Sequence, residues 1–259
     1  MDYLIDYLPD KEGYFHLTEG KELSYIEFGI INLTAGSSFQ GKEKDKEVGL
    51  ILLRGNGEIN VGGKVWKIER EDVFSQKSFG IYIPPGINWK VEEKKPLELA
   101  IAKASSRKKG KPVLISPDMI EKEIRGKEGF RREVYNIIDE RVDAERLIIG
   151  ETINFPGEWS SFPPHKHDKD NLPEESKLEE VYLFKIKPEE GFGLCRLYSA
   201  EKDIDKAYVI KNNSFLLIPK GYHPIVTIPG YKLYYLWVLA GEKRKLVPND
   251  DPNYRWIGR

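Results

Sequence analysis

The chain has 259 residues, a formal net charge of -1 and one cysteine. Its length allows one large β domain or two smaller ones, and either can bury a core. The single cysteine excludes an internal disulfide framework, and the balanced charge gives no basic surplus of the kind that binds nucleic acid.

The sequence contains no apolar run close to the ~18 residues that a membrane-spanning helix needs. Its first six residues lack the basic region and the long apolar core of a secretory signal. One cysteine is also typical of a reducing compartment. We therefore predict a cytoplasmic protein with neither a membrane nor a nucleic acid as its partner.

The apolar segments of the first half are short, rich in β-branched or aromatic residues, and bounded by Gly, Pro or Asn. This composition is typical of strands separated by turns. Residues 48–53 and 81–83 are predicted strands, and residues 55–63 are predicted to form a hairpin.

A polar, basic stretch at residues 103–111 is predicted to be a loop between the halves. The best helical candidate follows at residues 117–124, where Ser116 can cap the helix and Pro117 can open its first turn. The second half then returns to strand-like segments at residues 181–186, 215–218 and 234–239.

The two halves share a pattern in which a Pro-x-Gly turn joins two strand-like segments. The turn occurs at residues 84–86 and again at residues 219–221, and two positions later stand Asn88 in the first copy and His223 in the second. Such an internal repeat predicts two β-barrels in tandem, of which only the second carries a potential metal ligand at this position.

Three of the four histidines lie in two turn-rich segments of the second half, at His165, His167 and His223. Side chains alternate along a strand, so both imidazoles of an H-x-H pair point to the same face. Neutral imidazole is the commonest protein ligand for divalent transition metals. The pattern therefore predicts a metal site built on strands.

These motifs together resemble the cupin superfamily and, within it, the 5-deoxy-glucuronate isomerases of inositol catabolism. The first half resembles the family in general features, at residues 61–63, 72–74 and 84–86. The second half carries the specific resemblance, at residues 159–168, 178–182, 191–193, 219–224, 229–236, 240–241, 251–252 and 256.

The resemblance implies an all-β bicupin fold, with a barrel lacking metal ligands over residues 1–120 and a metal-binding barrel over residues 121–259. It implies a metal-dependent aldose–ketose isomerase that converts 5-deoxy-D-glucuronate to 5-dehydro-2-deoxy-D-gluconate. Three alternatives stay open: a related isomerase of the 4-deoxy-5-keto-uronate from pectin, a non-enzymatic cupin that binds sugar or metal, and an oxygenase on the same ligands.

The implied metal ligands are His165, His167, Glu180 and His223. Glu179 is the alternative carboxylate, and we favour Glu180 because it precedes the Val-Tyr pair as the ligand does in related uronate isomerases. Imidazole and carboxylate together suit several divalent ions. Zinc is the first candidate, with Mn, Fe, Co and Ni as alternatives.

Glu180, Tyr182 and Arg196 are the candidate catalytic residues. Glu180 or a tyrosine is a candidate for the base that moves a proton between adjacent carbons, as is a metal-bound hydroxide; a hydride shift is the alternative. Arg196, or Lys185, is a candidate to bind the substrate carboxylate, since Arg presents a planar fork that matches it. The partner is thus a small sugar acid, and a homo-oligomer stays open.

Residues 168–179 separate His167 from Glu180, a longer spacing than in common cupins. Most acidic residues in this segment, Glu174 and Glu175 among them, are interpreted as loop charges, while Asp168 is a candidate to support a histidine. We expect residues 168–177 to lie at the barrel mouth and to close over substrate, as active-site lids do.

Overall fold

The computed structural model describes residues 2–7, 11–19, 23–34 and 36–258. Regular structure in these ranges is almost entirely β, which confirms the all-β prediction. The elements of the first half are β1 (Leu4–Asp6), β2 (Gly13–His16), β3 (Glu27–Leu33), β4 (Ser38–Gly41), β5 (Lys46–Val61), β6 (Lys64–Arg70), β7 (Gly80–Ile83), β8 (Trp89–Ser105), β9 (Val113–Ile115) and the 3-10 turn η1 (Pro117–Met119).

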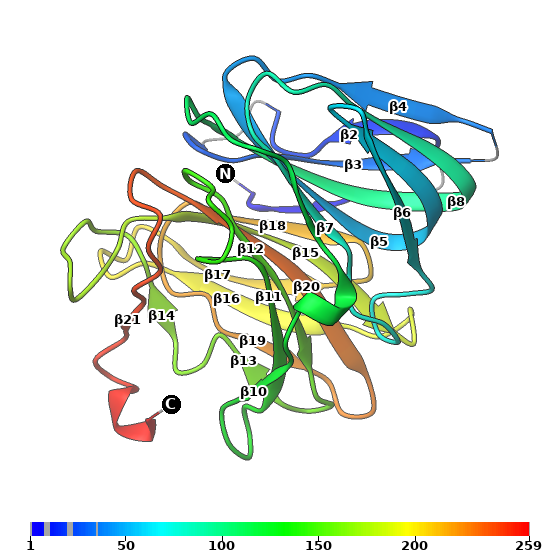
Figure 1. Cartoon of the computed structure of the whole chain (residues 1–259). Helices are drawn as coiled ribbons and strands as arrows, with labels where there is room; N and C mark the ends of the chain where they lie inside the picture. The colour runs from blue at the N-terminus through cyan, green and yellow to red at the C-terminus, as the bar shows by residue number, and fades with distance from the viewer. Residues whose placement is uncertain (1, 8–10, 20–22, 35, 259) are drawn as a thin grey trace. The chain divides into compact units, whose positions relative to one another are not determined.

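The chain continues with fewer long strands. These elements are β10 (Glu123–Arg125), β11 (Arg132–Ile138), β12 (Ile148–Asn154), β13 (Trp159–Ser160), β14 (His165–Lys166), β15 (Glu179–Lys187), β16 (Gly193–Tyr198), β17 (Asp205–Ile210), β18 (Ser214–Ile218), β19 (Ile225–Thr227), β20 (Lys232–Ala240), β21 (Asn249–Asp250) and the 3-10 turn η2 (Arg255–Ile257). Figure 1 shows them in chain order by colour.

The described chain divides into two compact units. The histidine unit contains residues 1–7, 122–135 and 150–259, and the N-terminal unit contains residues 8–121 and 136–149. The predicted boundary after residue 120 differs from this division mainly at two short segments. Residues 1–7 belong to the histidine unit, and residues 136–149 belong to the N-terminal unit.

Backbone pairing explains the first of these segments. Within the histidine unit, β1 pairs antiparallel with β18, and Leu4 is aligned with Leu216. A buried carboxylate explains the second segment, since Glu47 in the N-terminal unit accepts the backbone N–H groups of Glu145, Arg146 and Leu147 at 2.7 Å each. Neither pairing is visible in local sequence composition.

The N-terminal unit is built on an eight-stranded sheet with the main order β2-β3-β8-β5-β7-β9. The predicted hairpin is present: β5 and β6 pair from Val61 and Lys64 outward, leaving a two-residue turn. Gly62 and Gly63 have φ of 57° and 88°, the left-handed backbone that such a turn requires. A cluster of apolar side chains that includes Leu50, Ile59 and Trp89 fills the interior.

Two local predictions near the end of this unit need correction, the first in full and the second only at its start. The predicted helix at residues 117–124 is only the turn η1, because Ile120 is already extended. The side chain of Ser116 makes no capping bond to this turn. The predicted loop at residues 103–111 begins later, because β8 continues to Ser105 through its pairing with β5.

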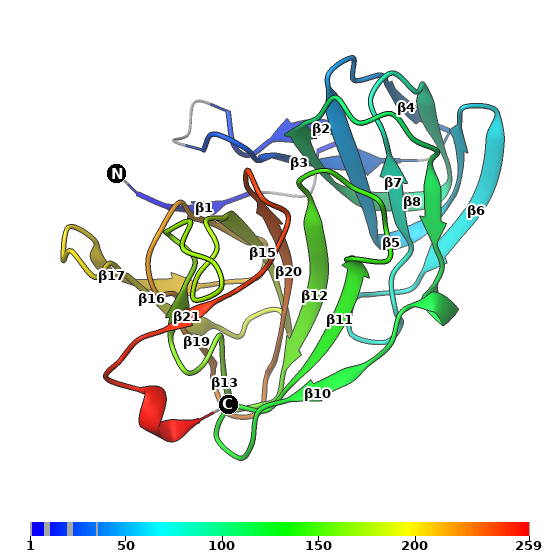
Figure 2. The ribbon, with the colours of Figure 1, turned by 60° about the vertical axis from the view of Figure 1, so that its left-hand side comes forward.

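The histidine unit contains a seven-stranded sheet of order β1-β18-β15-β20-β12-β11-β10 and a four-stranded sheet of order β13-β19-β16-β17. Figure 2 shows β20, β12 and β11 side by side. A two-stranded sheet joins β14 to β21, so the C-terminal segment runs next to the H-x-H pair (Figure 1). The described residues include no helix long and apolar enough to cross a membrane.

Candidate metal centre

The alternation of β15 brings Glu180 to the inside of the histidine unit. Glu180 is 4% exposed, whereas Glu179 on the opposite face is partly exposed. Glu180 is aligned with Ile218 on β18 and Leu239 on β20, so an apolar strand flanks it on each side. A carboxylate in this position needs polar or cationic partners, because burial disfavours its charge.

Two buried imidazoles supply those partners. His167 Nε2 lies 3.0 Å from Glu180 Oε2, and His223 Nε2 lies 3.2 Å from the same oxygen. Ligand atoms of His167, Glu180 and His223 all lie within 4.8 Å of one another. These three residues, called the His–Glu cluster below, come from two separate sequence motifs and from β15 between them.

The outward nitrogen of each imidazole contacts a backbone carbonyl. His167 Nδ1 lies 2.6 Å from the oxygen of Leu178, and His223 Nδ1 lies 2.8 Å from that of Gly221. A carbonyl oxygen only accepts, so each Nδ1 must carry the proton. Each Nε2 then faces Glu180 either as a bare lone pair or as a second protonated nitrogen.

This arrangement fits a divalent ion. Lone pairs of two imidazoles and a carboxylate converge on one point, where a cation relieves their mutual repulsion. His223 Nε2 is buried and makes no hydrogen bond, since its contact with Glu180 lacks hydrogen-bond geometry. Imidazole Nδ1–H donated to a carbonyl is also the usual support of a metal-binding histidine.

The electrostatics of the cluster point the same way. Burial raises the pKa of Glu180, but the close contacts and positive charge of the His167 and His223 imidazoles outweigh it and lower that pKa to about 2. Burial lowers the pKa of His167, while Glu180 raises it, and the net direction is upward. The cluster thus holds an ionised carboxylate and attracts positive charge, whether as protons or as a metal ion.

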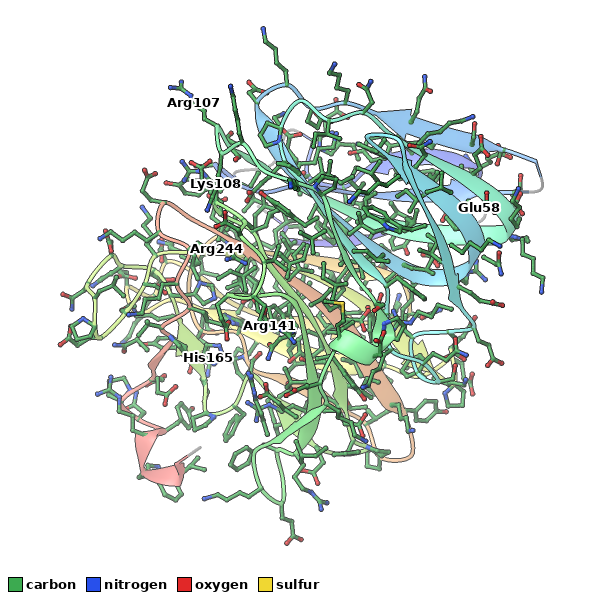
Figure 3. The ribbon with its side chains drawn as sticks, viewed as in Figure 1. Glu58, Arg107, Lys108, Arg141, His165 and Arg244 are labelled. Carbon is green, nitrogen blue, oxygen red and sulfur yellow. The ribbon has the colours of Figure 1, made fainter. Side chains whose placement is uncertain are left out.

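His165 lies beside the cluster and outside the group of three. Its ring centroid is 4.9 Å from that of His223 and 6.4 Å from that of His167. Its strand, β14, aligns His165 with Asp250 of β21, and the side chain is labelled in Figure 3. His165 is partly exposed, whereas the three residues of the cluster are buried.

Tyr182 also borders the cluster. Its ring centroid is 5.8 Å from that of His223, and its hydroxyl lies 3.1 Å from Ser161 Oγ. Burial, followed by the Glu180 charge, raises the pKa of Tyr182 well above its ordinary value. The phenol therefore stays protonated and presents a hydrogen-bond donor inside the unit.

Arg196, one of the two sequence candidates for the substrate carboxylate, points away from the interior of the histidine unit. Its neighbours Cys195 and Leu197 are buried, so the alternation of β16 turns Arg196 outward. The guanidinium makes two 2.8 Å bonds to the exposed Asp205 and stacks over Tyr198 at 4.3 Å. Lys185 likewise lies on the face of β15 opposite Glu180 and donates to Asn213.

The segment between His167 and Glu180, which we expect to close over substrate, is anchored by a buried carboxylate. Glu175, interpreted above as a loop charge, is 4% exposed and accepts Lys166 Nζ at 2.5 Å. Its Oε1 also accepts the backbone N–H groups of Asp168 and Lys169. The backbone N–H of Ser176 donates to the oxygen of Val247 at 3.0 Å, and the backbone N–H of Val247 donates to Ser176 Oγ at 2.9 Å.

Sequence analysis missed this buried ion pair because Lys and Glu in a polar stretch are typically solvated. The close spacing of a Lys inside the H-x-H pair and an acid in the following loop was its only sequence signal. Asp168 contacts neither histidine ring through a described bond; instead, its Oδ1 accepts the backbone N–H of Gly221 at 2.8 Å.

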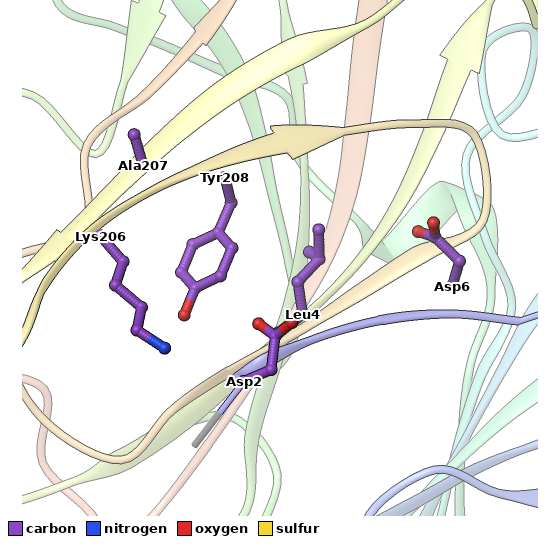
Figure 4. Close-up of a pocket in the computed structure, with 6 residues that line it drawn as sticks. All are labelled: Asp2, Leu4, Asp6, Lys206, Ala207 and Tyr208. Atoms are coloured by element: carbon purple, nitrogen blue, oxygen red, sulfur yellow. The ribbon is translucent and has the colours of Figure 1, made fainter.

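A separate pocket of about 510 Å³ lies in the same unit, between β1 and β17 (Figure 4). Its lining residues are Asp2, Leu4, Asp6, Lys206, Ala207 and Tyr208. None belongs to the His–Glu cluster, and charges of both signs line the pocket, so its composition indicates no ligand class.

An all-β fold with a buried carboxylate between two imidazoles defines a cupin-like protein. Consistent with this class, the chain is similar in fold to a Lactobacillus farciminis oxalate decarboxylase in complex with formate, with a TM-score of 0.69, 10% identity, and coverage of 100% of this chain and 91% of the other. At that identity the likeness concerns the fold alone.

The comparison with family models is more specific: residues 8–257 match the KduI/IolB family, and the chain belongs to it. A 5-deoxy-glucuronate isomerase of Geobacillus kaustophilus is 39% identical over 90% of this chain and 86% of its own. The Bacillus subtilis (strain 168) protein of that name is 35% identical over 93% and 90%. The solved IolB-like protein of Salmonella typhimurium shares 31% identity, has a TM-score of 0.95, and each chain is covered completely.

Proposed function

We propose that the chain is a metal-dependent aldose–ketose isomerase that converts 5-deoxy-D-glucuronate to 5-dehydro-2-deoxy-D-gluconate. The main support is the convergence of His167, Glu180 and His223, in a chain whose relatives at 33–39% identity are named 5-deoxy-glucuronate isomerase. The reaction is redox-neutral: one hydrogen moves from the carbon next to the aldehyde to the aldehyde carbon, and the hydroxyl proton on the first of these carbons moves to the former aldehyde oxygen.

We propose His165 as the fourth ligand. A divalent ion, zinc in the first instance, would be held by His165, His167, Glu180 and His223, and as a Lewis acid it would stabilise the charge that develops on the sugar oxygens. The proximity of the His165 ring to the His223 ring, 4.9 Å between centroids, supports this role. The N-terminal unit, which has Asn88 at the matching turn position, would bind no ion.

The residues around the cluster suit the remaining tasks. Glu180 is ionised and held by two imidazoles, which supports a role as ligand more than as proton carrier. Tyr182 keeps its proton close to His223, so its hydroxyl can donate to a substrate oxygen whose charge increases in the transition state. The Ser161 hydroxyl, 3.1 Å away, can donate to the Tyr182 oxygen and so leave the phenol proton for the substrate.

Arg255 replaces Arg196 as our candidate for the substrate carboxylate. Its Nε donates to the oxygen of Asp250, the residue aligned with His165, and its Nη2 to Asn249. An Arg side chain carries five N–H donors. Among the described residues, no carboxylate forms an ion pair with the guanidinium of Arg255. The guanidinium is exposed beside β14 and can still offer donors to an anion.

The test is to incubate metal-loaded protein with 5-deoxy-D-glucuronate under anaerobic conditions and follow the sugar by NMR. We expect a ketose signal without any redox cofactor, and in D₂O deuterium at the new CH₂OH carbon if a proton is exchanged. Conversion without deuterium would favour a hydride shift. Protein that binds metal but converts only the pectin-derived uronate, or acts only with oxygen, would contradict the proposed reaction.

A further inference from the structure

Two carboxylates, Asp168 and Asp251, each connect the segment that carries His165 and His167 to the turn that carries His223. Neither is within the His–Glu cluster. They lie in different parts of the chain, one directly after the H-x-H pair and one in the C-terminal segment. Their bonds run along separate routes, so the two connections are independent observations.

Asp251 is 4% exposed and uses both carboxylate oxygens. Its Oδ2 accepts the Tyr198 hydroxyl at 2.7 Å, and its Oδ1 accepts the backbone and side-chain N–H groups of Asn253. Its own backbone N–H donates to the oxygen of Pro164 at 2.8 Å. Asp251 is therefore attached directly to the residue before His165.

The route from Asp251 to His223 passes through Tyr198. Tyr198 and Tyr222 exchange two backbone hydrogen bonds, of 2.9 and 2.7 Å, and their rings lie 5.0 Å apart. Tyr222 directly precedes His223. The carboxylate, the Tyr198 hydroxyl and this backbone pair thus form a continuous connection between the two ligand segments.

Asp168 makes a shorter connection. It follows His167, and its Oδ1 accepts the backbone N–H of Gly221 at 2.8 Å, while the oxygen of Gly221 contacts His223 Nδ1. Gly221 has a φ of 98°, and a Cβ there would lie 2.6 Å from the oxygen of Tyr198. A side chain at this position is excluded, so the turn meets Asp168 and Tyr198 through its backbone.

We propose that Asp168 and Asp251 are positioning residues that set the separation between the imidazoles of the H-x-H pair and that of His223. The inference rests on the proposed metal centre. Its physical basis is that the ligands come from the short β14 and from a turn, and these two do not share a sheet. Cross-connections close to the ligands therefore add to the more distant β13–β19 pairing in setting the distance between them. Groups that orient metal ligands in this way typically contribute 10–100-fold to metal affinity.

The experiment measures metal affinity, without an activity readout. Metal-stripped wild type, Asp251→Asn, Tyr198→Phe, Asp168→Asn and the double variants are titrated with Co²⁺, and Zn²⁺ affinity is obtained by chelator competition. Asp170→Asn is the control, because it removes an exposed carboxylate of the same unit whose side chain, within the described chain, is paired with Lys243 and contacts neither connection. The melting temperature of each metal-free variant is recorded in parallel.

We expect each single variant to weaken Zn²⁺ binding by about 10-fold or more and to change the Co²⁺ absorption spectrum, with the control unchanged. Tyr198→Phe removes the hydroxyl that donates to Asp251, and Asp251→Asn weakens the same bond by replacing a charged acceptor with a neutral one. The effects of these two changes should therefore not add, whereas those of Asp168→Asn and Asp251→Asn should add. These isosteric changes are chosen because they leave the chain able to fold.

Variants that melt earlier yet bind both ions as wild type does would show a purely structural role and overturn the inference. Additive effects of Tyr198→Phe and Asp251→Asn would overturn the proposed route. Wild type that binds metal without isomerising the sugar would refute the proposed reaction and leave the positioning result standing. Wild type that binds no ion would refute both.

Discussion

The buried Lys166–Glu175 pair allows a stability prediction that does not depend on the proposed function. Both side chains are nearly inaccessible, at 7% and 6% exposure, and the ammonium lies 2.5 Å from the carboxylate. The two partners differ in what remains when the other is removed. Glu175 would still accept two backbone N–H groups, at 2.7 and 3.0 Å, whereas Lys166 would retain only Asp168, at 3.8 Å.

We therefore expect Glu175→Gln to be the more damaging single change. Leaving a buried charge uncompensated costs about 3–5 kcal/mol, and the more distant Asp168 should reduce this to about 3 kcal/mol. Lys166→Met should cost less, about 1–2 kcal/mol, because hydrogen bonds to a charged group keep Glu175 stabilised. At the usual slope for proteins of this size, 3 kcal/mol lowers the melting temperature by about 6–12 °C.

The assay is calorimetric or chemical unfolding of metal-stripped protein, with the change followed in the transition of the histidine unit. Lys177→Met is a suitable control, because Lys177 lies in the same loop and is exposed. A reversed order, with Lys166→Met more damaging than Glu175→Gln, would refute the reasoning. So would losses below about 1 kcal/mol for both, the range of a surface ion pair.

Two further predictions concern the cluster and the carboxylate. The pKa of Glu180 is lowered from 4.5 to about 2, so in metal-free protein its ionised form stabilises the fold fully above pH 4.5, and this stabilisation is lost as the pH falls toward 2. A Glu180→Gln variant should therefore lose less unfolding free energy than wild type over that pH range. Unfolding free energies that fall equally with pH in the variant and in wild type would contradict this prediction. For binding of the substrate carboxylate, Arg255→Ala should raise KM about 10-fold or more with little change in kcat, whereas Arg196→Ala should keep both constants within about 2-fold of wild type. Steady-state kinetics with the opposite ranking would make Arg196 the carboxylate-binding residue and exclude Arg255.

The sequence predicted the architecture because strands and turns leave local marks. Short β-branched segments bounded by Gly and Pro indicated an all-β chain, and paired glycines indicated the hairpin at Gly62 and Gly63. The repeat of the Pro-x-Gly turn indicated duplication. The local marks were weakest at residues 117–124, where a Ser-Pro start suited a helix but the following residues are extended.

The pattern of histidines and the parity of Glu180 also predicted which residues the structure brings together. Alternation alone separates Glu180 from Glu179, and Cys195 from Arg196, into opposite faces. It does not say which face is inside. For β15 the family resemblance made that choice, and the structure buries Glu180; for β16 no such guide existed, and packing buries Cys195 and exposes Arg196.

By itself, then, the sequence determined the strand-rich composition, the turns that need glycine and the grouping of ligand-type residues in two motifs. Tertiary structure alone decided which faces are buried, which segments each unit takes from the other half of the chain, and that Glu175 and Asp251 are buried carboxylates. The physical reason is range. Backbone conformation depends on neighbouring residues, whereas the environment of a charge depends on partners such as Tyr198, 53 positions from Asp251, that only the folded chain brings within hydrogen-bond distance.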